Sequence, residues 1–405
     1  MDIEVRPIAS EEYESFVRTT VAAFGGTYHP EELERERIEF EPGLSIAAFE
    51  SGVPVGTAAG ITFDLTVPGG FLPALAVTGV GVLPTHRRRG VLTALMRRQL
   101  DDAREAGTPL ATLWSSEGPI YPRFGYGLAS LHAALDVDTR HTAYSVPFTM
   151  RGRMRLLSEE EALKSFPDVY ERVRDRQPGF LSRPAEWWSH RFFIPERHRQ
   201  GYGDYFFALY EGDGPEGYVL YRTKHDWPDG LPGGTLDVEE LVAATDQAYA
   251  ALWRYCFDHD LMAKVTAELR PSFEPLLHLM QDPRRLRMRL ADALWVRPVD
   301  VRTALEGRRY RSAGRLLLDV RDQFCRWNEG RFELEASGEG AFCRPTTSMP
   351  DLTLGATELG ALYLGGTPAW ALVRAGRISE ERAGAAEEAD SMFGWTPPPW
   401  CPHRF

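Results

Sequence analysis

The sequence predicts an α/β protein of two or three domains. The chain has 405 residues, more than a single hydrophobic core usually serves. Hydrophobic residues make up 43% of it and charged residues 26%, which is ordinary for globular domains. From Ile3 to Val137, apolar runs of strand length alternate with segments of helical periodicity, which is typical of sheets covered by helices.

The first region is expected to contain most of the alternating elements. A Ser51-Gly52 turn joins two of its strands, and Gly25-Gly26 follows its first helix. We expect strands over residues 3–8, 44–50, 53–65, 71–83, 109–114 and 128–137, and helices over residues 11–23 and 31–40.

The most informative segment follows the strand over 71–83, where an apolar run ends in a basic turn. A helical pattern begins directly after Gly90. Backbone N–H groups at a helix N-terminus attract phosphate, and the Arg87 and Arg88 guanidinium groups can add charge-assisted hydrogen bonds. We therefore expect this turn to hold a pyrophosphate, with a solvated basic turn as the plainer alternative. It is neither a Walker loop nor a Gly-x-Gly-x-x-Gly turn.

A second segment of interest follows the strand over 109–114. Tyr121 lies four residues before Gly125, and Tyr126 comes next. A phenol of pKa near 10 can donate a proton to, or share a hydrogen bond with, a departing thiolate of pKa near 8.5. Both tyrosines could instead be core aromatics. Because the basic turn lies upstream, we favour Tyr121 as the functional residue and Tyr126 as a packing residue.

The second region repeats the order of the first but lacks its basic turn. The helix that begins near Asp246 follows Ala243-Ala244-Thr245, with no Arg and no Gly. The region is thus a duplicated domain that lost its phosphate cradle, or an unrelated α/β domain. We expect strands over residues 206–210, 217–222, 236–242 and 265–269, and helices over residues 158–174 and 246–259.

The third region ends in a proline-rich tail. With Trp400 and Phe405 in its last ten residues, this tail is expected to dock rather than fray, and His403 is either a proton relay or a solvated residue. We expect helices over residues 301–306, 357–362 and 369–374, and strands over residues 315–321, 330–335 and 341–344.

Charge and cysteine content exclude several classes of function. The net charge of −12 disfavours nucleic acids and anionic membranes as partners and favours cationic small substrates. The four cysteines show no Cys-x-x-Cys spacing, so neither a metal site nor a disulfide framework is expected. Without a signal-peptide pattern or an apolar run of about 20 residues, the protein is expected to be cytoplasmic.

Several motifs along the chain belong together. They are Pro-Thr-His-Arg-Arg-Arg-Gly at 84–90, Ser-Glu-Gly-x-Ile-Tyr at 116–121, Arg-Phe-Gly-Tyr-Gly at 123–127, Leu-Tyr-Leu-Gly at 362–365 and the terminal Phe405. Together they resemble the motifs of the enhanced-intracellular-survival (Eis) family of GCN5-related N-acetyltransferases. The acetyltransferase turn has the pattern Arg-x-x-Gly-x-small, and this chain departs from it at the last position, which is Leu92. The resemblance implies a hexamer. It also implies an active acetyltransferase domain over 1–137, a degenerate one over 148–296 and a sterol-carrier-like domain over 298–405, with 138–147 as a connector.

The resemblance also implies roles for individual residues, with acetyl-CoA as co-substrate. The backbone of Val80 and Val82 would contact the pantetheine arm, and Ser116 would line the junction between acetyl-CoA and the acceptor. The pyrophosphate would bind to Arg87, Arg88 and Gly90. Tyr121 would be the general acid, and the α-carboxylate of Phe405 the base or the anchor of the amine. Phe24 and Tyr28, with the glutamates between residues 31 and 41, would wall the acceptor site.

The expected function is therefore direct transfer of acetyl from acetyl-CoA to an amine in a ternary complex. The acceptor would be a small-molecule or peptidic amine, with aminoglycosides as one candidate class. Arg404, where the family pattern has an acidic residue, would disfavour such polycations. The alternative is a ligand- or lipid-binding protein with a vestigial transferase domain.

Overall fold

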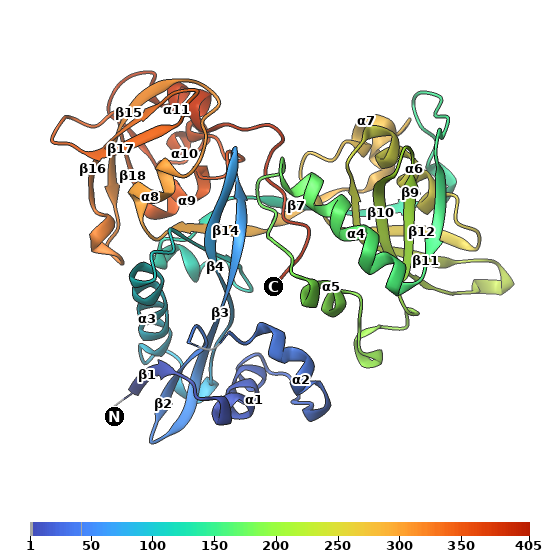
Figure 1. Ribbon diagram of the computed structural model, residues 1–405, viewed down its shortest axis with the longest axis horizontal. Helices are drawn as coiled ribbons and strands as arrows, with labels where there is room; N and C mark the ends of the chain where they lie inside the picture. The colour runs from blue at the N-terminus through green and yellow to red at the C-terminus, as the bar shows by residue number, and fades with distance from the viewer. Residues whose placement is uncertain (1–2, 42) are drawn as a thin grey trace. The chain divides into compact units, whose positions relative to one another are not determined.

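The computed structural model describes residues 3–41 and 43–405 and divides into two compact units (Figure 1). The first unit contains the chain up to Ser130, Leu294–Thr396 and Arg404–Phe405. The second contains Leu131–Ala293 and Pro397–His403. The first unit contains two sheets and the second unit one, and each unit has its own hydrophobic core.

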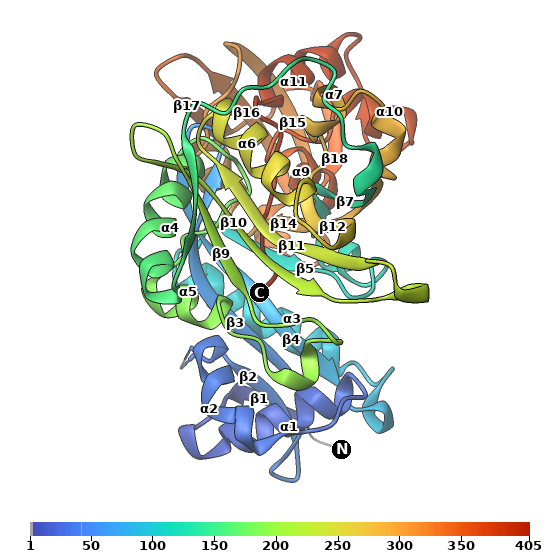
Figure 2. The same cartoon turned by 90° about the vertical axis from the view of Figure 1, so that its right-hand side faces the viewer.

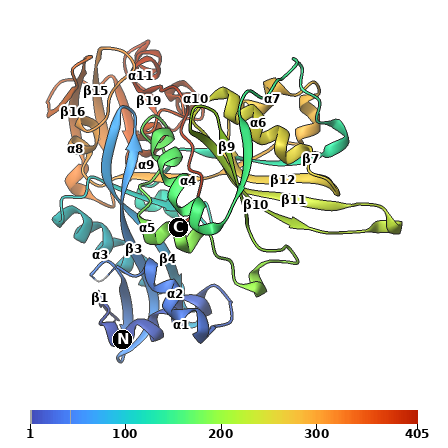
Figure 3. The same ribbon diagram turned by 45° about the vertical axis from the view of Figure 1, so that its right-hand side comes forward.

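The first unit contains a seven-stranded sheet in the order β1-β2-β3-β4-β5-β14-β6, in which β4 and β5 run parallel. Helices α1 and α3 cover its two faces (Figure 3). The strands are β1 Ile3–Pro7, β2 Ile46–Glu50, β3 Val53–Val67, β4 Gly70–Val82, β5 Leu110–Trp114, β6 Gly127–Leu128 and β14 Leu294–Pro298. The helices are α1 Tyr13–Ala23, α2 Leu33–Glu36 and α3 Val91–Glu105.

Strand β2 shows how the sequence builds these two layers. Its Ala47 and Phe49 pack with α1, whereas Ala48 packs against Leu95 of α3. Alternate residues of a strand point to opposite faces, so a fully apolar strand is buried on both sides. The expected helix over 31–40 is interrupted: only Leu33–Glu36 is α-helical, flanked by short 3-10 turns.

The chain passes from the seven-stranded sheet to the sheet of the second unit near Ser130, and it returns near Leu294. The strand expected over 128–137 is in fact β6 and a separate strand, β7 Leu131–Asp138, that belongs to the second sheet. The first sheet is completed by β14, which inserts between β5 and β6. The two compact units divide the chain near Ser130 and Leu294, whereas the sequence-based limits lie at 137 and 296, because the periodicity of a strand does not specify which strand it pairs with.

The rest of the first unit is a five-stranded sheet, β17-β16-β15-β18-β19, with four helices. Helix α9 packs so closely on β6 and β14 that a Cβ at Gly127 would lie 1.9 Å from the Thr357 carbonyl oxygen. A Cβ at Gly360 would lie 2.1 Å from the Val296 carbonyl oxygen. The elements are α8 Val301–Glu306, β15 Gly314–Arg321, β16 Gly330–Ala336, β17 Ala341–Pro345, β18 Leu352–Gly355, α9 Ala356–Leu362, α10 Ala369–Arg374, β19 Ser379–Glu380 and α11 Ala385–Phe393.

The second unit has a sheet in the order β13-β7-β12-β11-β10-β9-β8, with α4 and α6 on opposite faces (Figure 2). Helix α4 begins at a capping box, in which the Ser158 Oγ accepts a hydrogen bond from the Glu161 N–H and the Glu161 carboxylate accepts one from the Ser158 N–H. The further strands are β8 Arg153–Leu157, β9 Phe206–Glu211, β10 Pro215–Lys224, β11 Gly234–Ala243, β12 Met262–Pro271 and β13 Arg289–Asp292. The helices are α4 Glu159–Arg174, α5 Ala185–Arg191, α6 Asp246–Phe257 and α7 Leu276–Leu279.

The other structural features concern cysteines, metals and membranes. All four cysteines are buried free thiols. Over residues 3–41 and 43–405, no group of three or more His, Cys, Asp or Glu side chains is placed to hold a metal ion. In the same ranges, no helix combines the length and the apolar character needed to cross a membrane.

Candidate active site

The candidate site begins where β4 and β5 separate. The two strands pair from Ala74–Leu110 to Val77–Leu113, and β4 then continues to Val82 without β5 beside it. On its other side β4 stays paired with β3 through a bulge, where Gly79 has a φ of 56° and its carbonyl accepts a hydrogen bond from the Thr57 Oγ1 at 2.9 Å. The β4 edge that carries Val80 and Val82 is therefore not paired with β5, as backbone contact with a pantetheine arm would require.

The basic turn lies at the end of this edge and leads into α3. Arg88 and Gly90 both have positive φ, 62° and 84°, and a Cβ built at Gly90 would meet nothing within 4 Å. The first turn of α3 has no acidic residue, and no side chain caps its N–H groups. The positive end of the helix dipole is thus open to an anion, which fits a pyrophosphate.

The three arginines of the turn have different partners. Arg87 donates hydrogen bonds to the carbonyl oxygens of Val82, at 3.2 Å, and Ala23, at 2.9 Å, so it holds the turn against β4 and α1. Arg89 pairs with the Glu50 carboxylate at 2.7 Å. Arg88 is exposed and makes no side-chain hydrogen bond or ion pair with any residue that the structure describes. Of the two arginines expected to bind phosphate, Arg88 has the free guanidinium.

Tyr121 begins a short 3-10 helix, Tyr121–Phe124, beyond the end of β5. Its side chain is 6% exposed, and its hydroxyl makes no hydrogen bond to a described residue. Burial and the nearby Glu117 carboxylate raise the pKa of Tyr121 to about 12. The hydroxyl is therefore fully protonated at neutral pH and available as a hydrogen-bond donor.

Tyr126 lies deeper in the same core cluster, with its ring centroid 6.0 Å from that of Tyr121. It is completely buried, and burial raises the pKa of its hydroxyl far above the usual value. The side chain is inaccessible to a substrate, as expected for a packing residue.

Support for the Tyr121 segment comes from β14, which the sequence reasoning missed. Gly125 has a φ of 84°, and a Cβ there would lie 1.5 Å from the Arg297 Nη1. The fully buried Arg297 donates to the Asp322 carboxylate at 2.7 Å, and Asp322 also accepts from the Cys325 N–H. The only signal in the sequence was the glycine itself, because its partners lie far along the chain.

Two neighbouring serines follow β5. Ser116, the expected lining residue, is exposed. The Ser115 Oγ is buried and, among the described residues, has no hydrogen-bond partner. Within the described part of the chain, the Ser115 hydroxyl is therefore an unsatisfied buried polar group directly beside the exposed Ser116.

The last two residues lie against the first unit. The Phe405 ring centroid is 6.2 Å from that of Phe63 in β3, and the Arg404 guanidinium lies 5.5 Å from the ring of Trp114, the last residue of β5. His403 belongs to the second unit, where it is buried with Nδ1 3.2 Å from the Arg183 Nη2. Burial and the nearby arginines hold the pKa of His403 well below its usual value. The idea of a solvated tail histidine was therefore wrong.

A cavity of about 210 Å³ lies between α1 and the bulged part of the sheet. Its lining residues are Tyr13, Phe16, Val17, Thr20, Val21, Glu36, Phe40, Ala59, Thr78 and Gly79. The lining is mainly apolar and aromatic with one carboxylate, that of Glu36, which suits an amine with an apolar body. Neither Phe24 nor Tyr28 is among these residues: Phe24 is exposed, with its ring near Gly81, and Tyr28 packs under the Arg18 guanidinium at 3.9 Å.

The chain is similar to N-acetyltransferases of known sequence and structure. Residues 4–129 and 179–302 match acetyltransferase (GNAT) domains, and residues 301–402 match a sterol carrier protein domain. The chain is 42% identical over 409 residues to an uncharacterized N-acetyltransferase of Streptomyces avermitilis, an alignment that covers 100% of both chains. It is 34% identical over 348 residues to the N-acetyltransferase Eis of Mycobacterium tuberculosis, covering 84% of this chain and 83% of the relative. The crystal structure of Eis1 from Mycobacterium abscessus superposes with a TM-score of 0.87 at 33% identity, covering 99% of this chain and 100% of the other.

Proposed function

Because this chain belongs to the Eis family of N-acetyltransferases, we propose that its first unit transfers acetyl from acetyl-CoA to an amine in a ternary complex. The observation that carries this proposal is the open β4 edge, which ends at Arg88 and the uncapped N-terminus of α3. Tyr121 lies beyond the end of the neighbouring strand β5. An acyl-CoA thioester needs a backbone edge for its pantetheine arm, a cation for its pyrophosphate and a donor near its sulfur.

The chemistry assigned to Tyr121 follows from its raised pKa. The amine nitrogen attacks the thioester carbonyl carbon, the C–S bond breaks, and the amine loses a proton, so that the products are an amide and the free thiol of CoA. Complete proton transfer from a phenol of pKa about 12 to a thiolate of pKa about 8.5 is uphill by roughly 5 kcal/mol. Tyr121 therefore acts mainly by donating a hydrogen bond to the developing thiolate. The proton that the amine releases accounts for the proton on the free thiol of CoA.

The terminal carboxylate is assigned to the amine. An α-carboxyl of pKa near 3.5 is too weak a base to deprotonate an ammonium directly. It can instead hold and desolvate the ammonium at the thioester, while the proton leaves through water to the bulk solvent. The lining of the α1 cavity favours acceptors that combine one amino group with an apolar or aromatic body, and the Arg404 cation disfavours polycations such as aminoglycosides. A vestigial transferase acting only as a lipid carrier fits less well, because the basic turn and Tyr121 are both intact.

Replacing Arg88 with Ala is expected to weaken acetyl-CoA binding by at least about tenfold, since it removes the free cation of the turn. Isothermal titration calorimetry with acetyl-CoA measures this directly. The matched control is Arg89→Ala on the same turn, whose guanidinium already pairs with Glu50. Unchanged affinity in Arg88→Ala would contradict the assignment of the pyrophosphate to this turn.

The chain is also expected to assemble as a hexamer. Light scattering on the purified protein should then give a mass near six times 45.6 kDa. A single species at the mass of one chain would contradict this assembly and leave the chemistry of the first unit unaffected.

A further inference from the structure

The second unit contains an opening of the same kind as the one proposed to bind acetyl-CoA. Strands β11 and β12 pair in parallel from Gly234–Met262 to Val238–Ala267, and then both continue unpaired with each other, to Ala243 and Pro271. Helix α6 follows β11 as α3 follows β4. The order β11–α6–β12 therefore repeats β4–α3–β5, including the separation of the two parallel strands.

The helix end at this second opening is unsuited to phosphate. The Thr245 Oγ1 caps α6 by accepting a hydrogen bond from the Ala248 N–H at 3.1 Å, and it donates to the Glu216 carboxylate at 2.9 Å. Asp246 occupies the first turn of α6. The N–H groups that would bind a pyrophosphate are thus partly used, and two carboxylates would repel it.

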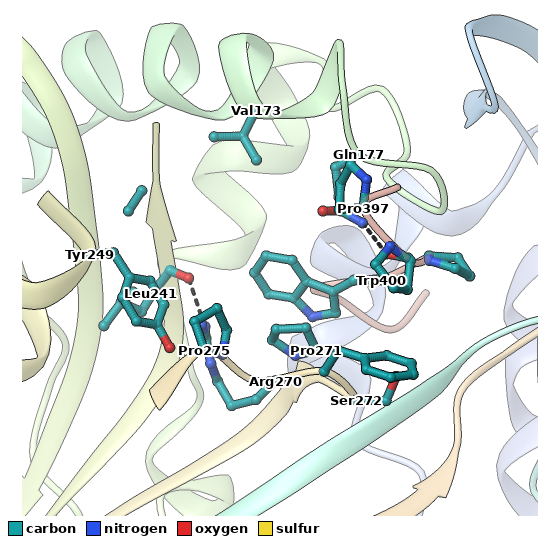
Figure 4. A pocket seen from close by; sticks show the side chains of 14 residues that line it. Val173, Gln177, Leu241, Tyr249, Arg270, Pro271, Ser272, Pro275, Pro397 and Trp400 are labelled. Atoms are coloured by element: carbon teal, nitrogen blue, oxygen red, sulfur yellow. Dashed lines mark hydrogen bonds between the residues drawn. The ribbon is translucent and has the colours of Figure 1, made fainter. Parts of the chain in front are cut away.

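The opening is instead filled by the segment Pro397–His403, here called the strap. The Trp400 Nε1 donates to the Leu269 carbonyl of β12 at 2.5 Å, and the Trp400 N–H donates to the Pro178 carbonyl at 2.8 Å. The Gln177 side chain donates to the Pro398 carbonyl at 2.6 Å. Figure 4 shows Trp400 and Pro397 on one side of a cavity of about 180 Å³, with Leu241 and Tyr249 across from them.

The residues of the second unit that surround the strap pack closely against it. Gly179 has a φ of 95°, and a Cβ there would lie 2.8 Å from the Trp400 carbonyl oxygen. The buried Arg270 guanidinium lies 5.0 Å from the Trp400 ring. At the far end, Arg183 contacts His403 and forms a buried ion pair with Glu240 of β11 at 2.9 Å. Backbone hydrogen bonds, a cation–π contact and an aromatic anchor are the features of a peptide-binding site.

We propose that the second unit is a binding site for a proline-rich peptide anchored by tryptophan, and that its occupant is the chain's own strap. The strap takes the position that the pantetheine arm is proposed to take in the first unit. The comparison of the two openings rests on the proposed function, but the peptide site itself does not. Each chain should consequently bind one acetyl-CoA.

Native-state thiol labelling of the full chain tests the site without reference to catalysis. Cys401 lies in the strap, and Cys256 in α6 is a buried internal standard in the same unit. Trp400→Ala should raise the maleimide labelling rate of Cys401, measured by peptide mass spectrometry, by roughly 100-fold or more. Gln177→Ala should raise it by about tenfold because one hydrogen bond is lost. The exposed-tryptophan control Trp227→Ala should change neither thiol.

A peptide with the sequence of residues 397–403 provides a direct binding test. Fluorescence anisotropy should show it binding Trp400→Ala at least about tenfold more tightly than the wild-type chain, whose own strap competes for the site. Equal binding to both proteins would overturn the proposal. So would Cys401 remaining as protected as Cys256 in Trp400→Ala, Cys256 becoming equally reactive there, or two acetyl-CoA molecules per chain in calorimetry. Loss of acetyl transfer by itself would bear only on the first unit.

Discussion

An affinity tag appended after Phe405, or deletion of Phe405, is expected to abolish acetyl transfer while leaving acetyl-CoA binding nearly unchanged. The terminal carboxylate is the proposed anchor of the acceptor ammonium, and extension converts it into a neutral amide with added bulk. The Phe405 ring contacts Phe63 of β3, and Arg404 lies over Trp114 at the end of β5, so the chain end lies against two strands of the transferase sheet.

The measurement compares turnover and acetyl-CoA affinity in three proteins: untagged, C-terminally tagged and N-terminally tagged. The N-terminal tag is the control and should be harmless. Full turnover by the C-terminally tagged enzyme would refute the role of the carboxylate. The carboxylate that lines the α1 cavity, Glu36, would then be the first alternative to examine. His403 would not, because its neutral ring is buried against Arg183.

Tyr121→Phe is expected to lower kcat by about 100-fold or more without changing acetyl-CoA affinity, because it removes the donor to the departing sulfur. The raised pKa adds a test with a defined sign. A hydroxyl with a pKa of about 12 stays protonated, and thus active, throughout the range from pH 7 to 10. The ratio of wild-type to variant kcat should therefore stay constant across that range.

Tyr126→Phe is the matched control. The Tyr126 hydroxyl has no hydrogen-bond partner among the described residues, so its removal should preserve folding and most of the activity. If Tyr126→Phe were the inactive variant and Tyr121→Phe the active one, the two roles would have to be exchanged. A wild-type to variant ratio that falls steeply above pH 8 would instead show that Tyr121 titrates much lower than its burial implies.

Most elements that could be predicted from the sequence depend on residues that lie close together in the chain. The helix expected directly after Gly90 and the helix expected over 158–174 each depend on residues close together in the sequence, and the structure confirms both elements. Features that depend on distant partners were missed. Nothing near Leu294 indicates that it pairs with Trp114, and nothing near Gly125 identifies Arg297 as the side chain that excludes a Cβ.

The roles of individual site residues likewise depend partly on local sequence and partly on distant partners. The spacing of the arginines predicted an anion site. It could not distinguish Arg87, whose guanidinium donates hydrogen bonds to two carbonyl oxygens, from Arg88. The acidic and aromatic composition of residues 24–41 suggested an acceptor wall, but the side chains that line the cavity depend on how α1 packs on the sheet. The direction of a side chain in an interrupted helix cannot be read from composition.

The insertion of β14 also determines how this enzyme can be made. During synthesis, β5 leaves the ribosome long before the strand that will cover its edge, and all of the second sheet is translated in between. The nascent transferase sheet must wait with an unpaired apolar edge, which is the kind of surface that chaperones bind and that seeds aggregation. Such non-local pairing also slows folding. The transferase sheet is therefore not a module that can be cut from the start of the gene, since a fragment that stops at residue 137 lacks both its seventh strand and Arg297.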